Sequence, residues 1–129
     1  MASIGGAIRT VLVDDSITGV SNRIYRDIAP PETAYPYITI FDELGNTPAL
    51  IGDQVVLARN RLVQVSLWQV RQSENTGIID EVVAALDNAT LSADKFVYRV
   101  RVSDIARTFN SEDDTILHAV TLNVIQKAQ

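Results

Sequence analysis

Apolar residues recur at helical spacing in two stretches of the chain. Near the N-terminus, Ser3 is placed to cap a helix whose apolar positions are Ile4, Ala7, Ile8, Val11 and Leu12. The second stretch follows a polar segment, residues 71–76, in which Ser73 or Asn75 can act as the cap. Its apolar stripe is Ile78, Ile79, Val82, Val83 and Leu86. We therefore expect two amphipathic helices.

Alternation of apolar and polar positions predicts strands at 37–41, 58–70, 96–105 and 115–125. Within 58–70, Val63, Val65 and Leu67 share one face. Within 115–125 the shared face is formed by Ile116, His118, Val120, Leu122 and Val124. A short additional strand near Tyr25 remains open.

The order of these elements, α-β-β-α-β-β, places neighbouring strands in hairpins and therefore predicts a mostly antiparallel sheet. We expect one α+β domain over residues 1–129, in two layers, with both helices on one face of the sheet. The opposite face is then open to solvent or to a partner. It would carry Gln64, Ser66, Trp68, Arg99, Arg101, Thr121 and Asn123.

Two segments between the predicted strands are rich in turn-forming or polar residues. Residues 42–57 contain Gly45, Pro48 and Gly52, which predict a long, partly ordered hairpin loop. The apolar pair Leu50-Ile51 at its centre suggests an arm that a partner orders, although the pair can also pack back onto the domain. Residues 107–114 are expected to form a second, polar hairpin loop.

The distribution of charge favours contacts with protein over contacts with nucleic acid. The net charge is −5, yet residues 59–71 and 96–107 together carry +5, which leaves −10 for the rest of the chain. We expect Arg99 and Arg101, with Trp68 nearby, to meet acids across a protein interface, unless these charges are merely solvated. The candidate acids are Asp80, Glu81 and the run Glu112-Asp113-Asp114.

The sequence contains no recognisable active site. It has no cysteine and a single histidine, His118, which we expect to be a packed or rim residue. The acidic pairs and runs, Asp14-Asp15 and 112–114, do not follow a calcium-loop pattern. Ser92-x-x-Lys95 lacks companion motifs. We therefore expect no catalytic, cofactor-binding or metal-binding residues, and without a signal peptide or membrane span we expect an intracellular protein. A carboxylate pair assembled from distant segments stays open.

Several segments in order resemble the tail completion, or tail-to-head joining, proteins of long-tailed bacteriophages, also called tail terminators. After an N-terminal helix, Arg23-Ile24-Tyr25 precedes a proline-rich stretch and the strand Tyr35-Pro36-Tyr37-Ile38-Thr39-Ile40. Leu62-Val63-Gln64-Val65-Ser66-Leu67-Trp68 follows, then a helix ending Val82-Val83-Ala84-Ala85-Leu86, then a terminal hairpin. The resemblance covers nearly the whole chain but does not account for residues 42–57.

The resemblance implies a structural role in the virion. Such proteins form a ring, generally hexameric, on the finished tail tube, where they end tube growth and present a docking surface to the head connector or stopper. DNA passes through the ring without specific binding, and the family has no catalytic residues or cofactor. The expected location is the head–tail junction, after assembly in the host cytoplasm. Two alternatives remain: another neck or minor tail protein, and a small cellular ligand-binding domain or enzyme with a dispersed site.

Overall fold

The computed structural model describes residues 4–20, 22–51, 55–93 and 96–128, and they form an α+β fold, as predicted. The helices are α1 (Ile4–Asp14) and α2 (Thr76–Leu86), and a short 3-10 turn, η1 (Arg71–Ser73), precedes α2. The strands are β1 (Ile24–Arg26), β2 (Tyr37–Ile51), β3 (Val55–Val70), β4 (Thr90–Ala93), β5 (Phe96–Asn110) and β6 (Thr115–Ala128).

The strands form one six-stranded sheet in the order β1-β2-β3-β6-β5-β4. Its four long strands, β2, β3, β6 and β5, pair with one another in antiparallel orientation. The short strand near Tyr25 exists as β1 and pairs in parallel with β2. Strand β4 was not predicted, because four residues are too few for alternation to distinguish a strand from a loop.

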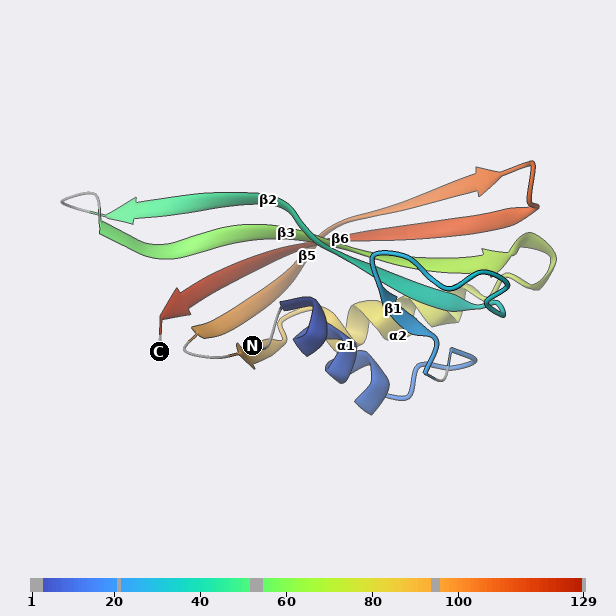
Figure 1. Cartoon of the computed structure of the whole chain (residues 1–129), viewed down its shortest axis with the longest axis horizontal. Coiled ribbons are helices and arrows are strands. Elements are labelled where there is room, and N and C mark those ends of the chain that lie inside the picture. The colour runs from blue at the N-terminus through green and yellow to red at the C-terminus, as the bar shows by residue number, and fades with distance from the viewer. Residues whose placement is uncertain (1–3, 21, 52–54, 94–95, 129) are drawn as a thin grey trace.

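Both helices lie on the same side of the curled sheet (Figure 1). Asn75 caps α2, since its Oδ1 accepts a hydrogen bond from Gly77 N at 2.9 Å, whereas Ser73 lies in η1. The predicted cap Ser3 lies outside the described residues. The apolar stripes of the helices are buried, including Ile8, Leu12, Val82 and Leu86.

The predicted core face of the sheet is confirmed. Val63, Val65, Leu67, Val120, Leu122 and Val124 are fully buried and join the helix stripes in one hydrophobic cluster. Ile17 and Val20, from the loop after α1, also belong to this cluster, as does Ile24 of β1. The core is therefore closed at this edge by a loop that sequence periodicity alone did not assign to it.

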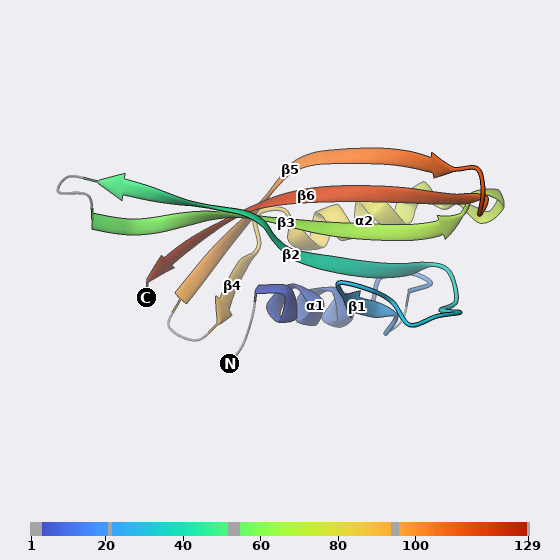
Figure 2. The same cartoon turned by 45° about the horizontal axis from the view of Figure 1, so that its top comes forward.

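The prediction of a loop at 42–57 is wrong, because strand pairing continues through most of that segment. β2 runs to Ile51 and β3 begins at Val55, with Pro48 opposite Arg59 and Ile51 opposite Val55. This part of the hairpin, residues 42–51 and 55–60, reaches beyond both helices, and we call it the arm (Figures 1 and 2). Among the described residues, β1 pairs with β2 at residues 38–40 alone, so the β2 strand of the arm lies at an edge of the sheet. A proline is tolerated there because its missing N–H can face outward.

The predicted loop at 107–114 is also shorter than expected. β5 continues to Asn110 and β6 starts at Thr115, so only residues 111–114 form the turn. A β-bulge between Val102 and Asp104 shifts the register of β5 against β6. The bulge inserts one residue, so the alternation that identified the strand is interrupted at residue 103.

Candidate interaction surfaces

The sheet face opposite the helices, here called the outer face, carries an aromatic cluster at one end. The Trp68 ring stacks on Tyr37 at 6.0 Å between centroids, and Tyr37 packs on Tyr35 at 5.2 Å. Trp68 Nε1 donates a hydrogen bond to Thr39 Oγ1 at 3.0 Å. Trp68 is therefore half-buried and held by its own subunit, and Phe41 is more exposed on the same strand as Tyr37.

Ser66 is less exposed than an open sheet face suggests. Ser66 was expected at the surface, but it is only 5% exposed and its Oγ accepts a hydrogen bond from Gln64 Nε2 at 3.0 Å. A short side chain between Trp68 and Gln64 is shielded by its larger neighbours. Burial raises the pKa of the Tyr37 hydroxyl, with smaller contributions from Tyr35 and Asp113, so Tyr37 stays neutral at physiological pH.

Arg99 and Arg101 lie exposed on the outer face, but the structure does not bring them to Trp68. Arg101 lies opposite Asn123, which lies opposite Leu62 on β3. Trp68 is six positions farther along β3, which corresponds to about 20 Å at the usual rise of a strand. The predicted cluster is thus divided into a basic end and an aromatic end. Arg101 also approaches Asp87 of its own chain at 3.8 Å.

Of the predicted acidic partners, Asp80 and Glu81 lie on α2, whereas residues 112–114 lie in the turn between β5 and β6. Asp80 is exposed on α2. Glu81 is half-buried, and its Oε1 accepts hydrogen bonds from Thr18 N at 3.3 Å and Thr18 Oγ1 at 3.0 Å. Leu50 and Ile51 lie at the end of β2, opposite Val56 and Val55. Asp80 and Glu81 lie on α2 and the arginines lie on β5, so the two groups belong to different elements.

The sequence did not predict a polar cluster that joins η1, β5 and β6. Glu74 accepts two hydrogen bonds from Arg107, at 2.8 and 2.9 Å, and pairs with His118 Nε2 at 2.9 Å. The hydrogen bonds from Arg107 are the main cause that lowers the pKa of Glu74 to about 2. His118 is buried, as expected for a packed residue. Arg107 lies opposite His118 only because of the bulge, so strict alternation could not have revealed the cluster.

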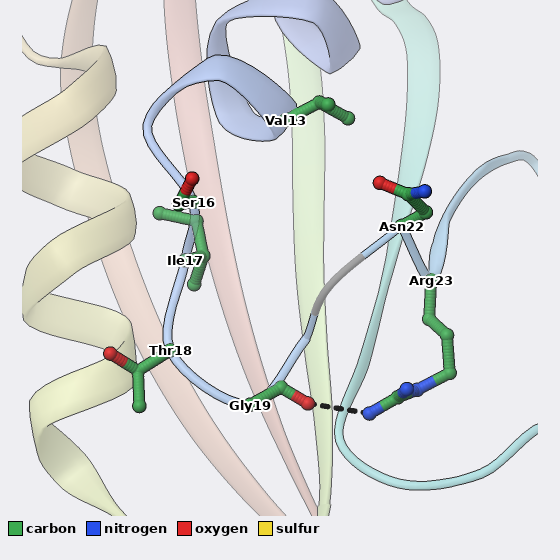
Figure 3. A pocket seen from close by; sticks show the side chains of 7 residues that line it. All are labelled: Val13, Ser16, Ile17, Thr18, Gly19, Asn22 and Arg23. Atoms are coloured by element: carbon green, nitrogen blue, oxygen red, sulfur yellow. Dashed lines mark hydrogen bonds between the residues drawn. The ribbon is translucent and has the colours of Figure 1, made fainter.

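A shallow hollow of roughly 370 Å³ lies beside the loop after α1 and is lined by Val13, Ser16, Ile17, Thr18, Gly19, Asn22 and Arg23 (Figure 3). The Arg23 side chain donates to Gly19 O and to Pro36 O, so it ties loop to loop. No lining residue forms a nucleophile–base pair. Among the described residues, no group of acidic or histidine side chains is arranged to hold a metal ion. The described helices are also too short or too polar to span a membrane.

Comparison with known proteins gives one family and similar folds. A family model described as "Tail completion protein gp17" matches residues 6–127. A solved chain from the "Virion of native gene transfer agent (GTA) particle" aligns with a TM-score of 0.73 at 13% identity, covering 98% of this chain and 96% of that one. Another solved structure aligns with a TM-score of 0.62 at 15% identity, covering 98% and 93%. No curated protein matches.

Proposed function

Because the chain belongs to the tail completion protein gp17 family, we propose that it forms a ring that caps the phage tail tube. Membership makes it a structural protein of a phage-like tail. The family match over residues 6–127 is the observation that carries the proposal. The fold it shares with a chain of a gene transfer agent virion supports the same role.

In this proposal the chain acts as one two-layer domain over residues 1–129, and about six copies close a ring. One side of the ring ends elongation of the tail tube protein. The other side receives the head connector or stopper protein at the head–tail junction of the virion. DNA passes through the lumen without specific binding, which a net charge of −5 favours because strong phosphate contacts would slow transit. No catalysis or cofactor is involved.

The ring contact is proposed to join two different surfaces of the subunit. Arg99 and Arg101 are exposed on the outer face, while Asp80 and Glu81 lie on α2. A heterologous contact needs two unlike, complementary surfaces, and these differ in sign of charge. The arm, with Leu50 and Ile51 near its tip, is proposed to reach a neighbouring subunit or the tube. Trp68 belongs to a separate aromatic end and would contribute apolar area there.

The test combines solution mass with tube growth. Native mass spectrometry of the purified chain, over a range of concentrations, is expected to find a species of about six subunits. When the protein is added to growing tail tube protein, tube length in electron micrographs is expected to stop increasing. Tubes that grow past the added protein at saturating concentration would contradict the capping role. Labelled protein located away from the head–tail junction of particles would favour another neck or minor tail protein.

A further inference from the structure

The side of β5 that faces away from β6 is hydrogen-bonded to other segments up to residue 102, and beyond that residue it has no described backbone partner. β4 pairs with residues 96–99. Val100 next exchanges backbone hydrogen bonds with Asn88 and Ala89, at 2.8 and 2.9 Å. Asp87 Oδ1 then accepts from Val102 N at 3.0 Å. From residue 103 to residue 110, no described strand or loop pairs with this side of β5, and we call these residues the β5 edge.

The backbone groups of three residues on the β5 edge point outward. Both the N–H and the C=O of Val100 point away from β6, as its bonds to residues 88 and 89 establish. Alternate residues of a strand present their backbone groups to the same side. Alternate residues of β6, starting from Val124 and ending at Ile116, lie opposite the β5 residues Val100, Val102, Ile105, Arg107 and Phe109. The N–H and C=O groups of Ile105, Arg107 and Phe109 are therefore available to another strand.

Two of the three side chains at these positions are apolar, and the third, Arg107, is paired with Glu74 of its own chain. Ile105 is 48% exposed and Phe109 is 46% exposed. Neither proline nor lysine interrupts residues 103–110, whereas the edge of the arm carries Pro48. An open, apolar edge strand is a template for pairing with another chain, and proteins usually protect such edges. The contrast between the two edges points to β5 as the one that pairs.

We propose that the β5 edge pairs with the β5 edge of a second copy, in antiparallel orientation about a two-fold axis at Arg107. In this register Ile105 of each copy lies opposite Phe109 of the other, so the exposed apolar side chains cover one another. Ala106 lies opposite Thr108, which places small side chains together on the outer face. Arg107 faces its own copy, but each guanidinium already holds the carboxylate of Glu74. The central charges are therefore compensated within each subunit.

Charge complementarity supports the same register. The pairing brings the acidic turn of one copy, residues 111–114, alongside residues near Arg101 of the other. Arg101 is exposed, and Glu112 and Asp113 in that turn are exposed as well. The two-fold axis repeats this basic-to-acidic approach on both sides of the contact. The apolar positions and the flanking charged positions therefore favour the same register.

The contact differs from the ring contact in its symmetry and goes beyond it, although Arg101 takes part in both. A two-fold contact uses the same surface on both subunits, whereas a ring uses two different surfaces. The paired form would protect the β5 edge of free subunits before assembly. It predicts a reversible dimer, which mass distinguishes from a species of about six subunits.

A single introduced cysteine tests the two-fold axis directly, because the chain contains no cysteine. Residues directly opposite in a hydrogen-bonded antiparallel pair have Cα atoms about 5.5 Å apart, within reach of a disulfide. Under mild oxidation, Arg107→Cys is expected to give a covalent dimer on a non-reducing gel. Ile28→Cys, at a position 81% exposed outside the β5 edge, is the matched control. Equal cross-linking of the two variants would overturn the proposal.

A charge placed on the edge gives a second test without covalent chemistry. Ile105→Lys is expected to weaken dimerisation at least about tenfold in sedimentation, while Ile28→Lys leaves it unchanged. Circular dichroism checks that both variants fold. If the folded Ile105→Lys variant dimerises like the parent, the edge is not the contact. Absence of a species of about six subunits would count against the ring alone.

Residue-resolved hydrogen exchange of the unmodified protein covers the case in which a variant misfolds. The amides of Ile105, Arg107 and Phe109 are expected to exchange quickly at low concentration and slowly at high concentration. Those of Ala106 and Thr108, which face β6, should be protected at both. If the amides of residues 105, 107 and 109 exchange at the same rate at low and high concentration, edge pairing is refuted.

Discussion

Glu74 is a single carboxylate that joins three parts of the fold, since it lies between η1 and α2 and bonds both Arg107 of β5 and His118 of β6. Its folded pKa of about 2 lies below its ordinary value of 4.5. A lowered pKa stabilises the fold fully above the ordinary pKa, and the stabilisation is lost as pH falls toward 2. Glu74→Gln should therefore lower the free energy of unfolding by about 1–3 kcal/mol at pH 7.

The difference between parent and variant should shrink as pH falls from about 4.5 to about 2, because both then carry a neutral side chain at this position. Urea unfolding at several pH values measures this. Glu32→Gln, at an exposed position outside the proposed contacts, is the control and should follow the parent throughout. A gap that stays constant down to pH 2 would mean that the charge of Glu74 is not what stabilises the fold.

Leu86 tests the core at the same scale. It is fully buried at the end of α2, where the helix meets the sheet. Leu86→Ala should lower the free energy of unfolding by about 2–5 kcal/mol, because the lost methyl groups leave a cavity. Ile28→Ala, at an exposed position, should change it by less than about 0.5 kcal/mol. Similar losses in the two variants would show that Leu86 has been misplaced in the core.

At the scale of elements, α2 starts at a cap formed by the Asn75 side chain, and Gln69 holds the backbone of that residue in place. Asn75 Oδ1 satisfies the N–H of Gly77, and Gln69 Nε2 and Oε1 bond the backbone of Asn75 from β3. Asn75→Ala should destabilise the protein by about 0.5–2 kcal/mol, as measured by thermal or urea unfolding. Ser73→Ala is the matched control, since Ser73 does not cap α2. An equal effect at both positions would count against the cap.

The elements that sequence predicted well are those with an uninterrupted period. The stripe of α2 and the alternation in β3 and β6 each have one buried face, which apolar residues reveal directly. The arm was missed because glycine and proline signal turns, although an edge strand tolerates both. β4 was too short to show a period. The Glu74 cluster and the separation of Trp68 from the arginines depend on strand register, which a bulge changes without a clear trace in the sequence.

The arm gives a prediction at this scale. Among the described residues, its β2 strand pairs with β3 alone and lies beyond both helices, so few contacts other than the hairpin hold this strand, whereas residues 58–60 also pair with β6 (Figure 1). Backbone amides of residues 45–51 should exchange quickly in the isolated subunit and slowly in the assembly, as hydrogen exchange can measure. Amides of residues 63–67, in the core part of β3, serve as the internal control. Strong protection of the arm in isolated subunits would argue against ordering by a partner.

At the scale of the whole molecule, charge is divided between surfaces. The exposed arginines Arg99 and Arg101 lie on the outer face, and the exposed acid Asp80 lies on the helix side. A repeated heterologous contact can use this division, because every junction brings one surface of each kind together. An isolated exposed ion pair contributes only about 0–1 kcal/mol, so its value here is chiefly to select the correct orientation.

The double substitution Arg99→Glu with Arg101→Glu tests the division of charge. In the proposed ring it would replace attraction to Asp80 and Glu81 with repulsion at every junction, so the species of about six subunits should be lost at low salt. Mass measured across a salt series should show partial recovery as screening increases, since exposed charges interact weakly beyond about 8–10 Å at physiological salt.

Trp68→Ala provides the comparison, because apolar contacts are not screened by salt. It should weaken assembly equally at all salt concentrations if the aromatic end belongs to the contact. If the charge-reversed variant assembles like the parent at low salt, the arginines do not hold the ring together. If Trp68→Ala also assembles normally, the outer face is not the ring interface, and the arm or α1 becomes the surface to test.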